Sequence, residues 1–444
     1  MFRRILIANR GEVVARVLRT CRRLGVEVVV VHSEADRDAP YVAEADAAVC
    51  IGPAPAARSY LDRMALIEAA RATGAAAIHP GWGFLSEDQL FADLVRQHAL
   101  TWIGPPAHAI RRMGRKLQAK AAARAAGLDV VPGSTSALAS AEDALAAAEA
   151  AGYPVIRKAD RGGGGRGMRV CRGPDEVAHA WELARAEALA SFGVADVFLE
   201  RYLEGGRHLE FQVLADGWGS AVHLGERECS VQRKHQKLVE ESPSVVLDAP
   251  TRARVGAAVA RLAREIGYVG AGTVEMLRDD EGTLRFLEMN TRLQVEHTIT
   301  ETRAGLDLVE LQLRIAAGER LPFDQDGVRL EGHAIELRLN AEDPRDGFRP
   351  SPGRLEAWQA PAGVRCDTHV AAGWVVGPHY DSLLAKLIGH APDRPACIAQ
   401  LEAALRELVV EGVATTRPLH EAVLASAAFR RGEYDTRAIP GWEG

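Results

Sequence analysis

Residues 288–296 read Glu-Met-Asn-Thr-Arg-Leu-Gln-Val-Glu, and side chains that bind metals or anions recur there at every second position. Successive side chains of an extended strand point to opposite faces. One face would then carry Phe286, Glu288, Asn290, Arg292, Gln294 and Glu296, and the other Leu287, Met289, Thr291, Leu293 and Val295. Fully extended, the stretch would span about 26 Å at ~3.3 Å per residue. Either the chain bends after Arg292 or the polar face serves successive subsites.

A surface strand is also polar on one side, but the segment upstream favours chemistry. Residues 273–277 predict a strand, which a turn at Glu281-Gly282 joins to residues 284–288 as a hairpin that places Glu275 opposite Glu288. Two like charges at that distance repel. A divalent cation would relieve the repulsion, and two carboxylates with the amide of Asn290 suit Mg²⁺ or Mn²⁺ rather than structural zinc. A bulged loop of odd length would break this register.

Composition limits the class of protein. The 444 residues are 47% hydrophobic and 26% charged, with a net charge of −6, which predicts two or three domains and favours neither a nucleic-acid binder nor a disordered tail. We find neither a run of about 18 apolar residues nor a signal peptide, and therefore expect a soluble, cytoplasmic protein without a membrane partner. The six cysteines lack CxxC spacing, which argues against a zinc site and a disulfide framework. Cys229 alone lies in a polar cluster.

Lysine is scarce. Of 54 basic residues only six are lysines, at positions 116, 120, 158, 234, 237 and 386. A lysine ammonium is a compact, mobile charge that approaches phosphate differently from a planar guanidinium. Some of these lysines could persist by chance, but several lie beside the motifs described below, which favours anion binding.

The elements that would position these residues begin with a parallel doubly wound unit, because strand, helix and strand alternate from the N-terminus. Strands are predicted at residues 4–8, 26–31, 75–78 and 101–103, with a helix from Gly11 to Leu24. The dinucleotide fingerprint is missing, since residues 8–11 contain one glycine where three are needed. Ligands of such sheets bind at the carboxyl ends of strands. The loop at residues 79–84 would therefore either contact a substrate or shape a domain junction.

Residues 131–203 predict a small separate unit. Its helices are expected at residues 141–151 and 174–191, and its strands at residues 154–159, 168–171 and 197–203. The glycine loop at residues 161–167 matches GxGxxG but leads into a strand, whereas a Rossmann or Walker loop opens a helix. It is either an exposed linker or a flap that closes over phosphates. Arg166, Arg169 and Lys158 favour the flap.

The densest polar run, residues 226–241, would most often be a solvated face, but Lys234 and Lys237 favour anion binding. Outside the small unit and the polar run, strands are predicted at residues 208–214 and 333–340, and helices at residues 114–126, 306–317 and 395–408. In the strand at 333–340, Glu336 and Arg338 would share a face with Asn340.

Taken together, these motifs resemble the biotin carboxylases, an ATP-grasp family, over essentially the whole chain. The matching segments are residues 8–12, 79–87, 113–116, 162–167, 226–241, 288–297 and 332–344. The most specific are Gln-Arg-Lys-His-Gln-Lys at 232–237 and the stretch 288–297. The resemblance implies an α/β protein with an N-terminal doubly wound parallel sheet (1–113), an ATP-grasp domain (114–330) containing a lid subdomain (131–203), and a C-terminal mixed α/β domain (331–444).

The resemblance also implies a reaction. ATP would phosphorylate bicarbonate to carboxyphosphate, and the carboxyl group would pass to N1 of biotin, as the first half-reaction of an acetyl-CoA or acyl-CoA carboxylase. By matching position, ATP would be held by Lys116, Lys158, Glu200, Leu203, His208, Gln232 and His235. The flap over the triphosphate would be Gly162, Gly163, Gly164, Gly165, Arg166 and Gly167. Mg²⁺ or Mn²⁺ would be bound by Glu275, Glu288 and Asn290.

Matching positions also assign the residues that would act on bicarbonate and on biotin. Bicarbonate would be gripped by Arg292 and Lys237, together with the backbone of Gln294 and Val295. Glu296 would be the general base. A free glutamate has a pKa near 4.3, so this base needs nearby cations and a dry, closed flap to be effective. Arg338 would stabilise the biotin enolate.

Several positions depart from the family pattern. Arg115 stands where an acidic residue is usual, and Asp160-Arg161 replaces small residues before the flap. Trp82 replaces a tyrosine, Asp88 an asparagine and Thr298 a proline. These departures remove no proposed catalytic group, although Arg161 could either strengthen or misplace phosphate binding.

Partners follow from the resemblance as well. We expect a separate biotin carboxyl carrier protein, because no Met-Lys-Met segment is present, and a carboxyltransferase that selects the acyl-CoA. Family members are commonly homodimers. One alternative is another ATP-grasp ligase, making a carboxylated purine intermediate or carbamoyl phosphate, which leaves Lys237, Arg338 and residues 79–84 without a role. The other is a non-catalytic regulatory copy, which would fit the departures at Arg115 and Arg161.

Overall fold

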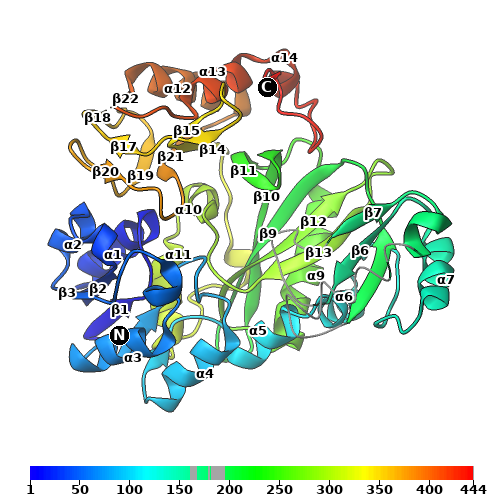
Figure 1. Cartoon of the computed structure of the whole chain (residues 1–444), viewed down its shortest axis with the longest axis horizontal. Coiled ribbons are helices and arrows are strands. Elements are labelled where there is room, and N and C mark those ends of the chain that lie inside the picture. The colour runs from blue at the N-terminus through cyan, green and yellow to red at the C-terminus, as the bar shows by residue number, and fades with distance from the viewer. Residues whose placement is uncertain (161–167, 179–180, 182–195, 444) are drawn as a thin grey trace.

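The computed structural model describes residues 1–160, 168–178, 181 and 196–443. Figure 1 shows the N-terminal sheet at one end of the molecule, the C-terminal elements at the top of the view, and a long central sheet that leads to a small unit around helix α7 (Ala141–Ala151). The glycine loop predicted at residues 161–167 and most of the helix predicted at residues 174–191 lie outside the described residues.

The N-terminal region is a parallel sheet between helices, as predicted. Its strands are β1 (Arg4–Ile7), β2 (Glu27–His32), β3 (Ala47–Cys50), β4 (Ala77–His79) and β5 (Thr101–Trp102), in the order β3-β2-β1-β4-β5. Its helices are α1 (Glu12–Leu24), α2 (Pro40–Glu44), α3 (Arg63–Ala72), α4 (Gln89–Gln97) and α5 (Ala107–Met113). Ile5 packs with α1, whereas Leu6 belongs to the cluster of α3 and α4. Burial of both faces explains why β1 and β2 are almost continuously apolar.

The central sheet has eight strands, and each neighbouring pair is antiparallel. In spatial order they are β13 (Leu284–Asn290), β12 (Gly270–Arg278), β9 (Arg207–Ala215), β10 (Ala221–Arg233), β11 (Gln236–Ser242), β14 (His333–Asn340), β21 (Leu383–Ala391) and β19 (Arg365–Thr368). The largest apolar cluster lies between this sheet and two helices, α6 (Lys116–Ala125) and α9 (Ala249–Glu265). The sheet therefore runs from the central region into the C-terminal one.

The polar run at residues 226–241 forms the β10–β11 hairpin, and most of it is buried. Taken alone, this run would most often be a solvated face, but the structure shows otherwise. Arg227, for example, is fully buried and donates to Glu210 and Gln212 on β9. Charges can be buried here because partners on neighbouring strands compensate them.

The lid unit forms a three-stranded sheet in the order β7-β6-β8. Its strands are β6 (Val155–Ala159), β7 (Arg169–Cys171) and β8 (Val197–Arg201), all within one or two residues of the predicted bounds. Helix α7 has the predicted bounds. A capping box between Ser140 and Asp143 begins it, since each side chain binds the other residue's backbone N–H.

The remaining elements connect and cover these sheets. Helices α10 (His297–Ala304) and α11 (Leu308–Ala316) follow the central hairpin. Short strands after β14 are β15 (Glu342–Asp343), β16 (Arg349–Pro350), β17 (Gly353–Arg354), β18 (Ala357–Gln359), β20 (Val375–Val376) and β22 (Val409–Glu411). The last helices are α12 (Arg394–Glu407), α13 (Arg417–Ala425) and α14 (Ala427–Arg431), and single 3₁₀ turns lie at residues 34–36, 56–58 and 325–327.

The β12–β13 hairpin keeps the predicted pairing by a different route. Its loop covers residues 279–283 and is not the predicted two-residue turn. A bulge at Leu287 shifts the register by one residue, so Glu275 still faces Glu288. The bulge also changes which side of the sheet two side chains face. Phe286, predicted on the polar face, lies in the core, and Leu287, predicted on the apolar face, lines a cavity. β13 ends at Asn290, the chain bends at Arg292 and turns at residues 295–296, so of the two alternatives for this stretch the bend is confirmed.

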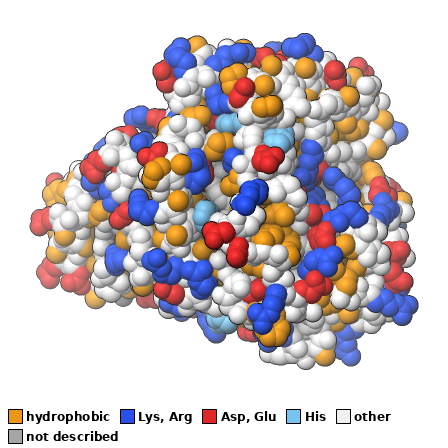
Figure 2. Space-filling view, turned by 180° about the vertical axis from the view of Figure 1, so that it is seen from behind, with side chains coloured by type: hydrophobic (Ala, Val, Ile, Leu, Met, Phe, Trp, Pro, Cys, Tyr) orange, Lys and Arg blue, Asp and Glu red, His pale blue; other side chains and the backbone are white. Residues whose placement is uncertain are grey.

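Basic and acidic side chains are interspersed over the face in Figure 2, as the modest net charge suggests. Among the described residues, no helix combines the length and apolar character needed to cross a bilayer.

Candidate active site

A cavity of about 830 Å³ lies between the lid strands β6 and β8 and the central sheet, and its wall includes Arg338 on strand β14. All predicted site residues in the described part of the chain line it: Lys116, Lys158, Glu200, Leu203, His208, Gln232, His235, Lys237, Glu275, Glu288, Asn290, Arg292, Gln294, Val295, Glu296 and Arg338. The predicted flap residues Gly162 to Gly167 lie outside the described residues. Residues distant in the sequence therefore share one site.

Three carboxylates form a row across adjacent strands, because Glu275 on β12 faces Glu210 on β9 and Glu288 on β13. Lys237 offsets this charge. Its Nζ lies 2.7 Å from Glu210 Oε2, 3.1 Å from Glu275 Oε1 and 2.6 Å from Glu296 Oε1. Burial by itself would raise the pKa of Glu275, but Lys237 and His208 outweigh it and hold that pKa well below its usual range.

The other end of the row fits a divalent cation. Burial, and then repulsion from Glu275, raise the pKa of Glu288, and within the described residues Glu288 makes no ion pair. Asn290 adds an amide that reaches Glu275 Oε1 at 2.8 Å. His208, Glu210 and Glu275 also bring ligand atoms within 4.8 Å of one another, but Lys237 already binds that side. An ion between Glu275 and Glu288 would remove the repulsion, so these residues fit Mg²⁺ or Mn²⁺.

Glu296 lies between two cations. It is fully buried and precedes helix α10. Its Oε1 accepts from Lys237, and its Oε2 accepts from Arg338 Nη2 at 2.9 Å. Burial alone would raise the pKa of Glu296, but Lys237, Arg338 and Arg227 together lower it far below the usual range. The carboxylate of Glu296 is thus ionised at neutral pH.

The two predicted arginines of the site, Arg292 and Arg338, are each held by a carboxylate that sequence analysis did not assign. Arg338 Nε donates to Glu240 Oε1 at 2.6 Å, and Arg292 Nε donates to Glu87 Oε2 at 2.9 Å. Glu87 belongs to segment 79–87, which matches the family pattern, so that match could have indicated a role for Glu87. Glu240 lay in a run that would most often be solvated, and the local pattern Leu-Val-Glu-Glu gives no signal that it is buried.

Removal of the Glu87 carboxylate tests whether it orients Arg292. We expect Glu87→Gln to raise the KM for bicarbonate about tenfold and to leave the KM for ATP nearly unchanged, because a loosened guanidinium loses part of its bidentate fit. The matched control is the neighbouring Asp88→Asn, because Asp88 caps α4 and asparagine caps helices equally well. Steady-state ATP turnover measures both, and equal effects of the two variants would contradict the role of Glu87.

The end of the cavity beside strands β6 and β8 contains further charge pairs. Glu200 on β8 accepts from Lys120 at 2.8 Å and contacts Lys158. Although burial acts against it, these lysines lower the pKa of Glu200. Burial lowers the pKa of Lys116, the first residue of α6. Leu287, exposed to the cavity by the bulge, adds apolar surface next to them.

Two departures from the family pattern contact each other. Asp160 Oδ1 accepts from the backbone N–H of Leu117 at 2.9 Å, and Arg115 lies 4.0 Å from the same carboxylate. The end of β6 is thereby attached to the start of α6, where Lys116 lies. Arg115 and Asp160 compensate each other's charge, so these changes do not by themselves indicate decay of the site.

The loop at residues 79–84 shapes a junction and also lines the cavity, while its contact with a substrate stays a prediction. Asn9 Nδ2 donates to the carbonyls of Pro80 and Trp82, and His79 is buried beside Gln312. Trp82 and Gly83 line the cavity. The loop therefore joins the N-terminal region to the site and also forms part of its wall.

Two buried glutamates near Arg338 have pKa values in the neutral range. Burial raises the pKa of Glu336 to about 8, although Lys386 opposes it, and raises that of Glu240 to about 7, although Arg338 opposes it. Glu336 also accepts a hydrogen bond from Thr298, the residue that replaces a proline. The folded state therefore binds protons that the unfolded chain releases above a pKa near 4.3.

This proton binding predicts a pH dependence of stability. The stabilisation is complete below the unfolded pKa and is lost as pH rises through about 7 and 8. We expect Glu336→Gln, which mimics the protonated acid, to show a smaller drop in melting temperature between pH ~6 and ~9 than the unmodified chain, by several degrees. Thermal denaturation measures this, and parallel pH curves for the two proteins would contradict it.

Comparison with known proteins assigns this site to a family. Three family models match in order: biotin carboxylase, N-terminal domain (residues 1–110), carbamoyl-phosphate synthase L chain, ATP binding domain (115–323), and biotin carboxylase C-terminal domain (336–441). A biotin carboxylase of Nostoc sp. is 48% identical over 440 residues, covering 99% of this chain and 98% of the relative. That of Pseudomonas aeruginosa is 49% identical, covering 97% and 96%.

Solved structures agree. A Campylobacter jejuni biotin carboxylase in complex with β-γ-ATP superposes with a TM-score of 0.94 at 44% identity and covers 98% of both chains. The biotin carboxylase domain dimer of Hydrogenobacter thermophilus 2-oxoglutarate carboxylase, with MgADP, ADP and bicarbonate, gives a TM-score of 0.93 at 44% identity, covering 98% of this chain and 97% of that one. The chain belongs to the biotin carboxylases, ATP-grasp ligases that carboxylate biotin.

Proposed function

We propose that this chain carboxylates biotin attached to a separate carrier protein, in the first half-reaction of an acetyl-CoA or acyl-CoA carboxylase. The observation that carries the proposal is the position of Glu296. It shares one cavity with the paired carboxylates Glu275 and Glu288 and lies directly between Lys237 and Arg338. A base for bicarbonate, an arginine for an enolate and a cation site for phosphates are thereby within reach of one another.

In the proposed reaction, Glu296 accepts the proton of bicarbonate while a bicarbonate oxygen attacks the terminal phosphorus of ATP. The bond from that phosphorus to ADP breaks, which leaves carboxyphosphate and ADP. Arg292 and Lys237 hold the bicarbonate. The bond between the carboxyl carbon and the phosphate oxygen of carboxyphosphate then breaks, and the phosphate that leaves accepts the proton of biotin N1. N1 bonds to the freed carboxyl carbon while Arg338 stabilises the enolate oxygen of biotin. Mg²⁺ or Mn²⁺ held by Glu275, Glu288 and Asn290 would neutralise phosphate charge.

ATP would bind at the lid end of the cavity. The residues proposed to hold it are Lys116, Lys158, Glu200, Leu203, His208, Gln232 and His235, with residues 162–167 as the flap. We also infer three domains, residues 1–113, 114–330 and 331–444, and a homodimer in complex with a biotin carboxyl carrier protein and a carboxyltransferase. The dimeric relative from Hydrogenobacter supports the homodimer.

The test is ATP hydrolysis by the purified protein with Mg²⁺ and bicarbonate, in the presence and absence of free biotin. Turnover that biotin stimulates supports the proposal. Turnover that is indifferent to biotin would indicate another ATP-grasp acceptor, and binding of ATP without turnover would indicate a regulatory copy.

A further inference from the structure

Of the six lysines, Lys386 alone lies outside both the motif segments quoted above and the cavity wall, but it contacts a residue of the site. It is fully buried on strand β21. Its Nζ donates to the backbone carbonyl of Val295 at 2.8 Å and lies 2.9 Å from Glu12 Oε1. Glu12, the first residue of helix α1, is only 2% exposed. One ammonium group therefore joins the C-terminal region, the N-terminal region and the stretch that carries Glu296.

The stretch needs such support, because residues 291–296 lie between β13 and α10 without regular secondary structure. Side chains from elsewhere hold its backbone instead: Glu87 accepts from the Thr291 N–H at 2.8 Å, and Lys386 binds the Val295 carbonyl. The Val295 carbonyl and the Glu296 N–H belong to one planar peptide group. A cation that fixes this carbonyl therefore fixes the point from which the Glu296 side chain projects.

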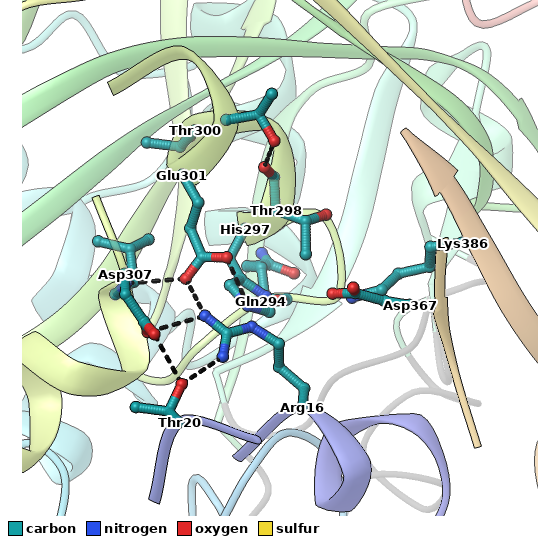
Figure 3. Close-up of polar contacts among 12 residues, drawn as sticks. Arg16, Thr20, Gln294, His297, Thr298, Thr300, Glu301, Asp307, Asp367 and Lys386 are labelled. Atoms are coloured by element: carbon teal, nitrogen blue, oxygen red, sulfur yellow. Dashed lines mark hydrogen bonds and ion pairs between the residues drawn. The ribbon is translucent and has the colours of Figure 1, made fainter. Parts of the chain in front are cut away.

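The same helix α1 contacts α10 at a second point. Arg16, four residues after Glu12, donates to Glu301 Oε1 at 2.5 Å and to Asp307 Oδ1 at 2.8 Å. Figure 3 shows Arg16 with these carboxylates and Lys386 around the same buried junction, near Gln294 and His297. Buried charges on α1 thus reach the end of the stretch through Glu12 and Lys386, and helix α10 through Arg16.

Strand pairing places Lys386 beside the proposed biotin residue. Arg338 on β14 is directly opposite Lys386, and Asp367 on β19 is opposite on the other side. Arg338 binds the carboxylate of Glu296, while Lys386 binds the carbonyl that precedes it. Arg338 and Lys386, which face each other on neighbouring strands, thus hold the side chain of Glu296 and the peptide group that precedes it.

We propose that Lys386 is a positioning residue for carboxylation, which fixes the Val295 carbonyl and so the proposed base Glu296, with Glu12 as its counter-charge. The inference rests on the proposed function. It gives Lys386 a role at the site without contact to substrate, while Glu12 only compensates the buried charge of Lys386.

The test separates positioning from stability. Lys386→Met leaves Glu12 buried and unpaired, so both the melting temperature and turnover should fall. The double variant Lys386→Met/Glu12→Gln removes both charges, so the melting temperature should recover. Turnover should stay low, with kcat for biotin-dependent ATP hydrolysis reduced about 10- to 100-fold and the KM for ATP within about threefold, because misplacement of about 1 Å costs on the order of 100-fold.

Glu12→Gln keeps an acceptor beside Nζ and leaves the bond from Lys386 to Val295 intact, so its turnover should stay within about threefold. The matched control is Arg394→Met/Glu241→Gln, which removes a buried ion pair that does not contact residues 291–296. Recovery of turnover with stability in the double variant would overturn the proposal. The proposal would also be overturned if folded Glu12→Gln lost as much turnover as Lys386→Met. This comparison tests the proposal even if the double variant fails to fold. Failure of the unmodified chain to respond to biotin would instead reject the proposed function.

Discussion

Glu296→Gln is expected to lower biotin-dependent ATP turnover by about 10²- to 10⁴-fold, the range that a general base contributes. The protein should stay folded, because each cation keeps another carboxylate: Lys237 still binds Glu210, and Arg338 still binds Glu240. ATP affinity should change less than about threefold, since the site residues proposed for ATP are untouched. Steady-state turnover with and without biotin, together with an ATP titration, measures both quantities.

Glu226→Gln provides the matched control for Glu296→Gln. Glu226 is also a buried glutamate paired with an arginine, Arg252, but the cavity does not include it. Its turnover should stay within about threefold of the unmodified chain. Undiminished turnover in folded Glu296→Gln would remove Glu296 from the role of base.

Glu288→Gln is expected to weaken activity while it stabilises the metal-free protein. The like-charge repulsion with Glu275 disappears, which should raise the melting temperature in EDTA by about 1–2 °C, since such pairs are worth up to ~1 kcal/mol. The same change removes a proposed ligand. The Mg²⁺ concentration that gives half-maximal turnover should therefore rise on the order of 100-fold.

Glu288→Gln is thus expected to raise the melting temperature and to lower the activity, two changes of opposite sign. Simple damage to the hairpin would lower both stability and activity. The control is Glu281→Gln in the loop of the same hairpin, where the side chain is 66% exposed and should affect neither quantity. An unchanged Mg²⁺ dependence in Glu288→Gln would contradict the assignment of Glu275, Glu288 and Asn290 to the metal.

The sequence alone determined the features that depend on short-range order. Short, continuous apolar runs located the parallel strands, and the alanine-rich segment 141–151 located helix α7, because both are local properties of the chain. Motif spacing placed Lys237, Glu296 and Arg338 in one family pattern, and the structure brings them into one cavity. The facing of Glu275 and Glu288 was predicted correctly, although the predicted turn was wrong.

Tertiary structure alone decided which carboxylates hold these cations. Glu87, Glu210, Glu240 and Glu12 come from different elements, and their contacts depend on strand order and on how α1 packs, which no local pattern contains. The bulge that turns Leu287 into the cavity is likewise a property of the pairing of two strands. Buried charges are stable only where distant partners compensate them. The sequence could therefore name the cations of the site, whereas the folded chain had to supply their counter-charges.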